Sequence, residues 1–345
     1  MSAIIVSDLH SHAWPRFSTT LPDGTNSRFA DLLNVLAQVD AYADEHEVRD
    51  ILILGDLTHR RGYVQFSIYS RICDWLASHI RIGRRVIALV GNHDIESEGH
   101  HSLEPLRYMG VEVIEQPTWS HSDDGVPWLL IPYLQHDMVK AVNDAPRIMG
   151  AREPEETIAF MHYAFDGKVL SNEFSVPSAL KRSEMSDYAK VILGHIHTPS
   201  VDDSRTVYVG APMHFDFSDS GDRFCWLLDR RTLTQLPLKF PRFVTTTYPR
   251  LPAPPADMPG FLRVLNTPRQ LFGDVKKEAL ASGWQDTLIV EVSMPVEAVR
   301  TLSAATLVNE DMVRDYVQTQ YGELDKTTRG EIMALGLKYL REASE

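Results

Sequence analysis

The chain has 345 residues, of which 43% are hydrophobic and 23% charged, and its formal net charge is −13. These values exclude a disordered or fibrous chain and predict a globular protein with one large domain and one or two smaller ones. The two cysteines, Cys73 and Cys225, form no CxxC pair, which indicates a reducing compartment without a disulfide framework. The sequence opens without a basic segment leading into an apolar one, and no apolar run reaches about 18 residues, so we expect a soluble cytoplasmic protein.

The negative charge argues against a nucleic-acid partner, because phosphate backbones attract lysine and arginine. This argument against a nucleic-acid partner is weakened because part of the acidic surplus lies in the last hundred positions. Bound metal ions would also add positive charge. Four adjacent basic pairs are local candidates for phosphate contacts: Arg60-Arg61, Arg84-Arg85, Lys181-Arg182 and Arg230-Arg231. Each pair taken alone is better explained as an ordinary solvated pair.

Short apolar runs alternate with helical patterns in the first hundred residues, which is typical of a sheet flanked by helices. Strands are predicted at 3–7, 51–54 and 86–90, with amphipathic helices at 28–45 and 64–80 between them. Polar residues follow each strand directly. They are, in order, Asp8-Leu9-His10, Gly55-Asp56 and Gly91-Asn92-His93-Asp94.

The same arrangement continues further along the chain. A strand at 128–133 ends in a Pro-Tyr turn, a strand at 158–161 presents His162, and a strand at 191–193 presents Gly194-His195-Ile196-His197. A strand and an aromatic-rich segment are expected within 208–217, and two closing strands at 223–229 and 233–240. The fold class predicted from this order is α/β, with two sheets packed face to face between helices.

The polar residues at the strand ends form a set of metal-competent side chains. Open α/β sheets place their sites at the carboxyl ends of strands, and glycine lets the chain turn sharply there. Any one of these histidines is more simply read as an ordinary core or surface residue. Together they predict a dinuclear site for a transition metal, able to hold the attacking and leaving oxygens of a displacement at phosphorus. The expected ligands are Asp8, His10, Asp56, Asn92, His162, His195 and His197.

The segment from 249 to 260 holds five prolines in twelve residues and is predicted to be a linker between a domain at 1–248 and a tail. Beyond it, strands at 261–264 and 287–292 bracket a helix at 268–282, which predicts a small α+β domain over 261–305. Amphipathic helices are expected at 310–321 and 326–342, within 306–345. Their apolar residues Ile332, Leu335 and Tyr339 either bind a partner or pack on the small domain.

The order D-x-H, G-D, G-N-H-D, H and G-H-x-H between Ser7 and His197 resembles the calcineurin-like metallophosphoesterase superfamily. Within it, the chain is similar to SbcD-type DNA repair nucleases and to their phage relatives, the recombination endonuclease subunits. The residues that carry this finer resemblance are His59, Ile131-Pro132-Tyr133, Tyr208-Val209-Gly210-Ala211-Pro212 and Phe217-Ser218-Asp219. The resemblance implies a two-sheet metallophosphoesterase sandwich with a capping domain, C-terminal helices that bind an SbcC-type coiled-coil ABC ATPase, and a homodimer.

The resemblance also implies a role for each site residue. Asp8, His10, Asp56 and His197 would hold one metal, and Asp56, Asn92, His162 and His195 the other, with Asp56 as the bridge. A hydroxide shared by the two ions would attack phosphorus while His93 protonates the leaving oxygen, Asp94 orients His93 and His59 contacts the scissile phosphate. The implied cofactor is two Mn²⁺ ions, although the ligand spacing does not separate Mn²⁺ from iron or zinc.

The favoured interpretation is a manganese-dependent DNA nuclease subunit with 3′ to 5′ exonuclease and endonuclease activity, acting in an SbcCD-like recombination and repair complex. The run Gly55-Asp56-Leu57-Thr58-His59 equally resembles cyclic-nucleotide phosphodiesterases, so a small-molecule phosphodiesterase is the alternative. A binding scaffold without chemistry is disfavoured because all seven ligands and His93 are present. Protein phosphatases, with Asp-Arg in place of His59-Arg60, and purple acid phosphatases, with tyrosine in place of His59, are disfavoured too.

Overall fold

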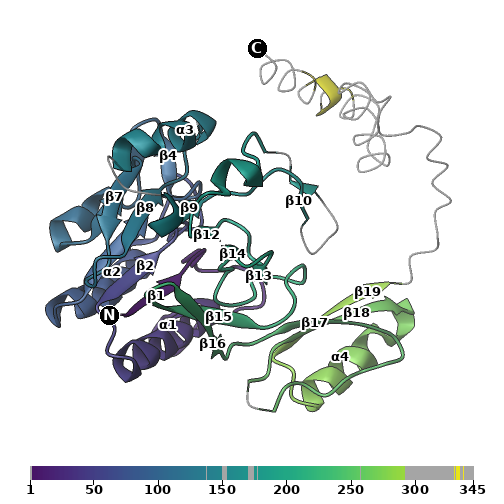
Figure 1. The fold of residues 1–345 in the computed structure, drawn as a ribbon. Helices are drawn as coiled ribbons and strands as arrows, with labels where there is room; N and C mark the ends of the chain where they lie inside the picture. The colour runs from purple at the N-terminus through teal and green to yellow at the C-terminus, as the bar shows by residue number, and fades with distance from the viewer. Residues whose placement is uncertain are drawn as a thin grey trace. The chain divides into compact units, whose positions relative to one another are not determined.

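The computed structural model describes residues 2–136, 138–149, 154–169, 175–176, 178–256, 258–291, 330, 332–334 and 337. The chain divides into two compact units, Met1–Val292 and Ser293–Glu345. The first unit contains all of the strands described below (Figure 1). Among the described residues, no helix combines the length and the apolar character needed to cross a membrane.

Two six-stranded sheets form the body of the first unit. One has the strand order β16 (Thr232–Leu238), β15 (Arg223–Asp229), β1 (Ser2–Val6), β2 (Asp50–Ile53), β3 (Arg85–Leu89) and β6 (Glu112–Ile114). The other has the order β13 (Ser200–Val201), β14 (Thr206–Tyr208), β12 (Lys190–Gly194), β9 (Ile158–His162), β8 (Pro127–Ile131) and β7 (Thr118–His121). In both sheets the central strands run parallel, so their carboxyl ends meet at one edge.

The two sheets pack face to face, and each carries helices on its outer face. In β1, Ala3 and Ile5 point toward the second sheet, whereas Ile4 and Val6 point toward α1 (Ser27–Glu45) and α2 (Phe66–Arg81). This alternation follows from the period of two along a strand. Helix α3 (Met138–Met149) covers the outer face of the second sheet through Met138 and Val142 (Figure 1). The predicted α/β fold of two stacked sheets between helices is therefore confirmed.

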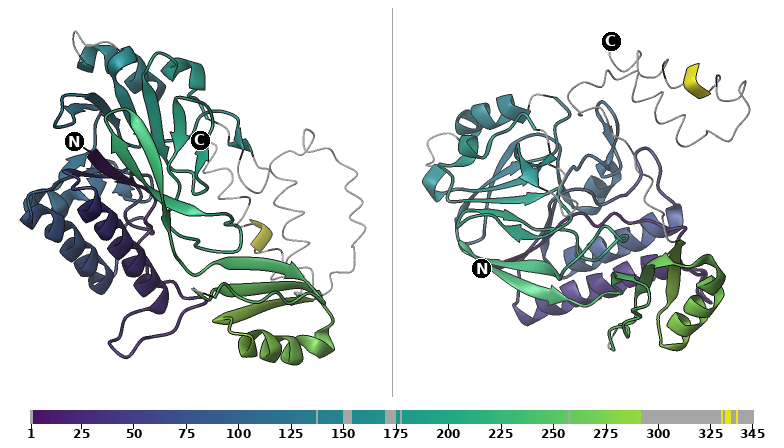
Figure 2. Two further views of the ribbon diagram at one scale, coloured as in Figure 1. Left: turned by 60° about the horizontal axis from the view of Figure 1, so that its bottom comes forward. Right: turned by 90° about the vertical axis from the view of Figure 1, so that its right-hand side faces the viewer.

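A third sheet of three parallel strands consists of β17 (Phe243–Thr247), β18 (Phe261–Thr267) and β19 (Asp286–Glu291). Helix α4 (Phe272–Ala281) lies along one face of it (Figure 2), where Val275 and Ala279 pack on Leu262 and Val264. The predicted unit of strand, helix and strand is present as β18, α4 and β19. The structure adds β17, which the sequence analysis had left in the large domain.

The proline-rich segment 249–260 differs from its prediction as a linker between domains. It connects β17 to β18 within one sheet, because Phe243–Thr247 pairs residue by residue with Phe261–Leu265. The indole nitrogen of Trp284 donates to the carbonyl oxygen of Pro252 at 2.9 Å, and Leu251 packs on the small core. The prolines thus form a crossover held against the small sheet, and the small sheet begins before residue 249.

Other differences concern single elements. The strand expected within 208–217 is β14, which ends at Tyr208, and a loop follows it. Two-stranded ribbons not predicted from the sequence are β4 (Ile95–Ser97) with β5 (His100–His101), and β10 (Lys168–Val169) with β11 (Ser175–Val176). Short 3-10 helices occur at Glu104–Met109, Pro154–Glu156, Arg182–Met185 and Arg269–Leu271. The expected helix 310–321, Leu335 and Tyr339 lie outside the described residues, whereas Ile332 is helical and half-buried.

Candidate metal centre

All seven expected ligands lie at the carboxyl ends of the central strands of the two large sheets. Asp8 and His10 follow β1, Asp56 follows β2 and Asn92 follows β3. His162 ends β9, and His195 and His197 follow β12. The parallel order of these strands is what brings residues nearly 190 positions apart into one site.

Four of these residues adopt the left-handed backbone conformation that favours glycine. The φ angles are 53° at Asp8, 43° at His10, 52° at Asp56 and 79° at His195. For a residue with a Cβ this conformation costs about 1–2 kcal/mol. The strain turns each side chain back over the end of its strand and into the site.

Three glycines leave the space that the site residues occupy. A Cβ on Gly55 would strike the ring of His162, one on Gly91 would strike Asp56, and one on Gly194 would strike Ser7 and the carbonyl oxygen of Leu54. Sharp turns are the reason expected from the sequence, and Gly55, with a φ angle of 88°, fits it. Gly91 and Gly194 have no positive φ angle, so close packing around the site is the reason for glycine at these two positions.

The donor atoms of the expected ligands gather into two neighbouring sets, and a third set, made of nitrogens from His10, His59 and His93, lies beside them. In the first, ligand atoms of Asp8, His10 and His197 all lie within 4.8 Å of one another. The second contains Asp56, His162 and His195 within the same limit. A carboxylate oxygen of Asp56 lies 3.7 Å from Nε2 of His10 and 3.4 Å from Nε2 of His162, so Asp56 stands between the two sets.

Asn92 completes the second set. Its amide oxygen lies 3.0 Å from Nε2 of His162 and 2.9 Å from Nδ1 of His195. Nδ1 of His162 points the other way, 2.5 Å from the carbonyl oxygen of Leu54, which orients the ring. A backbone acceptor on the far nitrogen is the usual partner of a metal-binding histidine.

The donors fit divalent cations. Oδ1 of Asp8 and Nδ1 of His10 are buried without a hydrogen-bond partner, and the Nε2 atoms of His10 and His197 face each other at 3.0 Å. Burial lowers the pKa of His10 well below its usual range and, with His162, lowers that of His195 to about 3. Neutral imidazoles with free lone pairs are the form that binds metal.

The pKa values of Asp8, Asp56 and His162 depend on one another. Burial raises the pKa of Asp8. Burial would also raise the pKa of Asp56, but His162 and His10 hold it well below its usual range. Burial acts to lower the pKa of His162, yet Asp56 and Asp8 outweigh it and raise that pKa to about 9. A cation would take the place of this proton between the carboxylates and the ring.

His93 lies beside the first donor set. Its ring centroid is 4.7 Å from that of His10, and its backbone nitrogen donates to Asp56 at 2.8 Å. Nδ1 donates to the carbonyl oxygen of His59 at 2.6 Å, so that nitrogen keeps its proton in both charge states of the ring. Nε2 is then the atom able to give up a proton.

The expected role of Asp94 in orienting His93 is corrected by this geometry, because the carbonyl oxygen of His59 holds the ring instead. The carboxylate of Asp94 accepts from the backbone nitrogen and hydroxyl of Thr58, both at 2.9 Å, and from the backbone nitrogen of Gly91 at 3.0 Å. It is buried, and burial together with Asp56 raises its pKa to about 6. Asp94 therefore ties the loop after β2 to the loop after β3.

His59 lies where the metal donors meet a cavity of about 640 Å³. Its ring is 5.3 Å from that of His10 and 4.3 Å from that of Trp14. Burial, with His12 and His93, lowers its pKa to about 4. The cavity wall is rich in aromatic and arginine side chains: His12, Trp14, Arg16, Phe17, Arg60, Phe215, Phe217 and Arg263.

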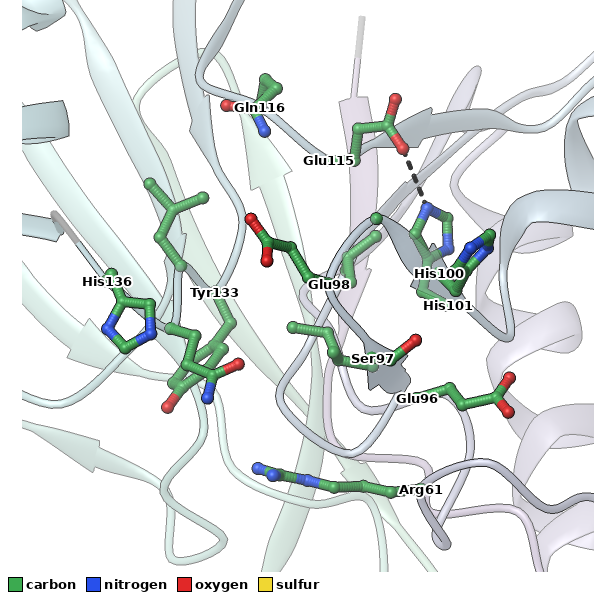
Figure 3. A pocket seen from close by; sticks show the side chains of 15 residues that line it. Arg61, Glu96, Ser97, Glu98, His100, His101, Glu115, Gln116, Tyr133 and His136 are labelled. Atoms are coloured by element: carbon green, nitrogen blue, oxygen red, sulfur yellow. Dashed lines mark hydrogen bonds and ion pairs between the residues drawn. The ribbon is translucent and has the colours of Figure 1, made fainter. Parts of the chain in front are cut away.

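A second cavity of about 760 Å³ is lined by Tyr133 (Figure 3), whose ring lies 6.2 Å from that of the expected ligand His195. The expected ligands themselves do not line this cavity. Figure 3 shows Tyr133 and His136 on one side and His100 and His101 on the opposite side. Three glutamates, Glu96, Glu98 and Glu115, also line this cavity, with Arg61 as its one arginine.

The four basic pairs fall into two groups. Arg84, Arg85 and Arg182 form ion pairs with Asp44, Asp50 and Asp202 at 2.6–2.7 Å, and Arg230 lies 3.6 Å from Asp124. Arg182 and Arg230 agree with the expectation of ordinary solvated pairs, whereas Arg84 and Arg85 are half-buried and Asp50, the partner of Arg85, is buried. Arg60 and Arg61 differ, since each lines one of the two cavities beside the metal donors.

Comparisons with known proteins show the family of this chain. Residues 1–199 match the family of calcineurin-like phosphoesterases, and the chain belongs to that family. No curated protein matches the chain. A solved structure of nuclease MPE from Pseudomonas putida is 21% identical over 51% of this chain and 67% of its own, with a TM-score of 0.28.

Two further solved structures are similar at 11% identity. One is the calcineurin-like phosphoesterase YfkN from Bacillus subtilis, with 69% of this chain and 89% of that chain covered and a TM-score of 0.41. The other is TT1561 from Thermus thermophilus, with 68% of this chain and 98% of that chain covered and a TM-score of 0.40.

As a member of this family, the chain is a metal-dependent hydrolase of phosphate esters with a dinuclear centre. Two bound divalent ions would supply an activated water molecule and neutralise charge on the phosphoryl oxygens. Trp14, Phe215 and Arg263 are neighbours of the site that are not predicted from the sequence. Two of them carry a local signal: Trp14 follows the Asp-x-His run by a few positions, and Phe215 lies in the aromatic-rich segment expected within 208–217.

Proposed function

We propose that the chain is a manganese-dependent DNA nuclease, with 3′ to 5′ exonuclease and endonuclease activity, in an SbcCD-like recombination and repair complex. The observation that supports this most is the cavity lined by His59, whose ring lies 5.3 Å from that of His10, and also by Arg263 on β18 and Leu288 on β19. A small phosphodiester needs only the metal site. A polynucleotide needs a longer surface with cations for phosphates and aromatic faces for bases.

The side chains in place suit hydrolysis of a phosphodiester. His93, held through Nδ1 by the carbonyl oxygen of His59, would give the proton on Nε2 to the leaving oxygen. His59 and Arg60 lie at the mouth of the cavity, where they would hold the phosphate. The proposed partners are DNA, a coiled-coil ABC ATPase of the SbcC type and a second copy of this chain.

Cleavage assays test the substrate. The purified protein with Mn²⁺ is expected to degrade 3′-labelled DNA, while Asp56→Asn, which removes the carboxylate between the two donor sets, is expected to be inactive. Cyclic AMP is expected to turn over poorly. Rapid hydrolysis of cyclic AMP with inert DNA would overturn the proposal in favour of the small-molecule phosphodiesterase, which the net charge of −13 favours.

A further inference from the structure

The two cavities beside the metal donors differ in charge, and the difference defines a direction for a phosphate chain. The cavity at Tyr133 carries three glutamates and one arginine; Glu115 is paired with His101 and Arg107 at 3.0 Å, so the acidic character rests on Glu96 and Glu98 (Figure 3). The cavity at His59 carries three arginines, Arg16, Arg60 and Arg263, with Asp216 as its one acid. Phosphates are repelled by the first set and attracted by the second. A strand that extends from the site therefore lies on the His59 side.

Trp14 is the tryptophan that lines this cavity beside His59. Its ring is 4.3 Å from His59 and 5.3 Å from Phe215, and Phe215 in turn is 5.4 Å from His10. The indole is backed by Phe215 in a stacked arrangement with an interplanar angle of 24° and is half-buried. This backing fixes a large flat ring on the cavity wall, one ring away from a metal donor.

A second fixed group stands further along the same cavity. The guanidinium of Arg263 lies 4.9 Å from the ring of Phe217, and its Nη2 donates to the carbonyl oxygen of Phe217 at 3.3 Å. Phe17 packs edge-on against Phe217 at 5.3 Å. The cavity thus offers a flat ring beside His59 and a cation beside Phe217, which are the two kinds of group that bind a base and a phosphate.

We propose that Trp14 is the stacking platform for the nucleobase next to the scissile phosphate. The substrate is then a nucleic-acid strand in which the base at that position has a free face. Bases inside a duplex have both faces covered by neighbours. The site therefore takes single strands and strand ends. This inference rests on the proposed function, since it names the form of nucleic acid that the same site accepts.

The test compares Trp14→Ala with the wild type on two single-stranded oligonucleotides. One is normal, and the other has an abasic residue on the leaving side of a single cleavable phosphate. Stacking on an aromatic side chain accounts for about a 5- to 100-fold effect per base. The wild type is expected to lose that factor in kcat/KM on the abasic strand. Trp14→Ala is expected to lose it on the normal strand and to lose nothing further on the abasic one.

Two other variants serve as controls. Trp14→Phe keeps an aromatic face and is expected to retain the preference for the normal strand. Tyr108→Ala removes an aromatic side chain that is 92% exposed and lies outside the cavity, and it is expected to behave as the wild type. If Trp14→Ala and the wild type lose the same factor on the abasic strand, Trp14 only supports His59 and the proposal is wrong.

A second pair of substrates separates this inference from the proposed function. Thymidine 5′-p-nitrophenyl phosphate carries a base, and methyl p-nitrophenyl phosphate does not. Inert DNA would reject the nuclease proposal. In that case base stacking would still be supported if the wild type preferred the thymidine ester and this preference were abolished in Trp14→Ala but kept in Trp14→Phe. An equal preference in all three proteins would reject base stacking.

Discussion

The backbone conformation of four site residues sets the direction of their side chains. Asp8, His10, Asp56 and His195 all have positive φ angles, and at about 1–2 kcal/mol each this is a large cost beside the total stability of a domain. The parallel strands on which these residues end are fully buried and absorb that cost. The site is therefore expected to keep its shape when the metal is removed.

His93 allows the role of a proton donor to be separated from metal binding. It lies beside His10 and is not one of the seven expected ligands, although nitrogens of His10, His59 and His93 also lie within 4.8 Å of one another. We expect His93→Leu to keep the bound metal and to lose about 10²- to 10⁴-fold in kcat, the usual contribution of general acid catalysis. Elemental analysis and cleavage rates measure the two properties separately.

His121→Leu is the matched control, since His121 is exposed at the end of β7. It should retain both metal and activity. A His93→Leu protein that is inactive because it has lost its metal would show that His93 is a ligand after all.

At the scale of elements, the loops after β2 and β3 fit into each other. Asp94 accepts hydrogen bonds from both loops, and the carboxylate of Asp56 fills the space left by the missing side chain of Gly91. We expect Gly91→Ala to lower both the melting temperature and the metal content, because the added methyl group displaces Asp56. Gly273 in α4 has no atom within 4 Å of its potential Cβ.

Gly273→Ala is therefore the control. Alanine at such a helical position stabilises by about 0.4–1 kcal/mol. It should leave metal binding unchanged and raise the melting temperature slightly. Normal metal content in Gly91→Ala would contradict the close fit of the two loops.

Helix α1 carries a buried ion pair whose effect depends on pH. Arg28 is buried, donates to the carbonyl oxygen of His214 at 3.0 Å, and lies 4.6 Å from the ring of Phe243 on β17. Its other partner, Asp31, is 3.6 Å away. Burial raises the pKa of Asp31 from 3.8 to about 6, although Arg28 acts in the opposite direction.

The sign of the pH dependence follows from that shift. The folded protein binds the Asp31 proton more tightly than the unfolded chain, so this contribution to stability is complete below pH 3.8 and is lost as the pH rises through about 6. We expect Asp31→Asn to gain about 1–2 kcal/mol over the wild type between pH 4 and pH 7. Urea unfolding at several pH values measures this difference, with the exposed Asp187→Asn as control. A gain that does not change with pH would contradict it.

At the scale of the whole molecule, the features that can be predicted from the sequence are those that depend on local residue patterns. Buried strands ending in glycine and a polar residue are local patterns, and the parallel sheets then bring those residues together. The orientation of His93 depends on a carbonyl oxygen 34 positions away, which no side-chain pattern reveals. The prolines at 249–260 indicate a break in secondary structure. They do not indicate that Phe243–Thr247 and Phe261–Thr267 pair across it.

That pairing decides where the chain is best shortened to test the ATPase partner. A chain ending after Pro249 would leave β17 without β18 and would remove Phe261, which lies 5.0 Å from Arg28. A chain ending after Val292 keeps the whole first unit. We expect this chain to fold, to bind metal and to cleave DNA without ATP, because every expected ligand lies before residue 198.

The segment it removes, 293–345, contains Ile332 and the two other apolar residues proposed to bind a helix pair of the ATPase. Loss of this segment is expected to abolish co-purification with the ATPase and any activity that requires ATP, while Ile332→Asp in the full chain weakens both. The matched substitution Val201→Asp, at a position 60% exposed on β13, should leave co-purification intact. If the shortened chain still bound the ATPase, the partner surface would lie within residues 1–292, and the resemblance to SbcD-type nucleases would have to be tested there.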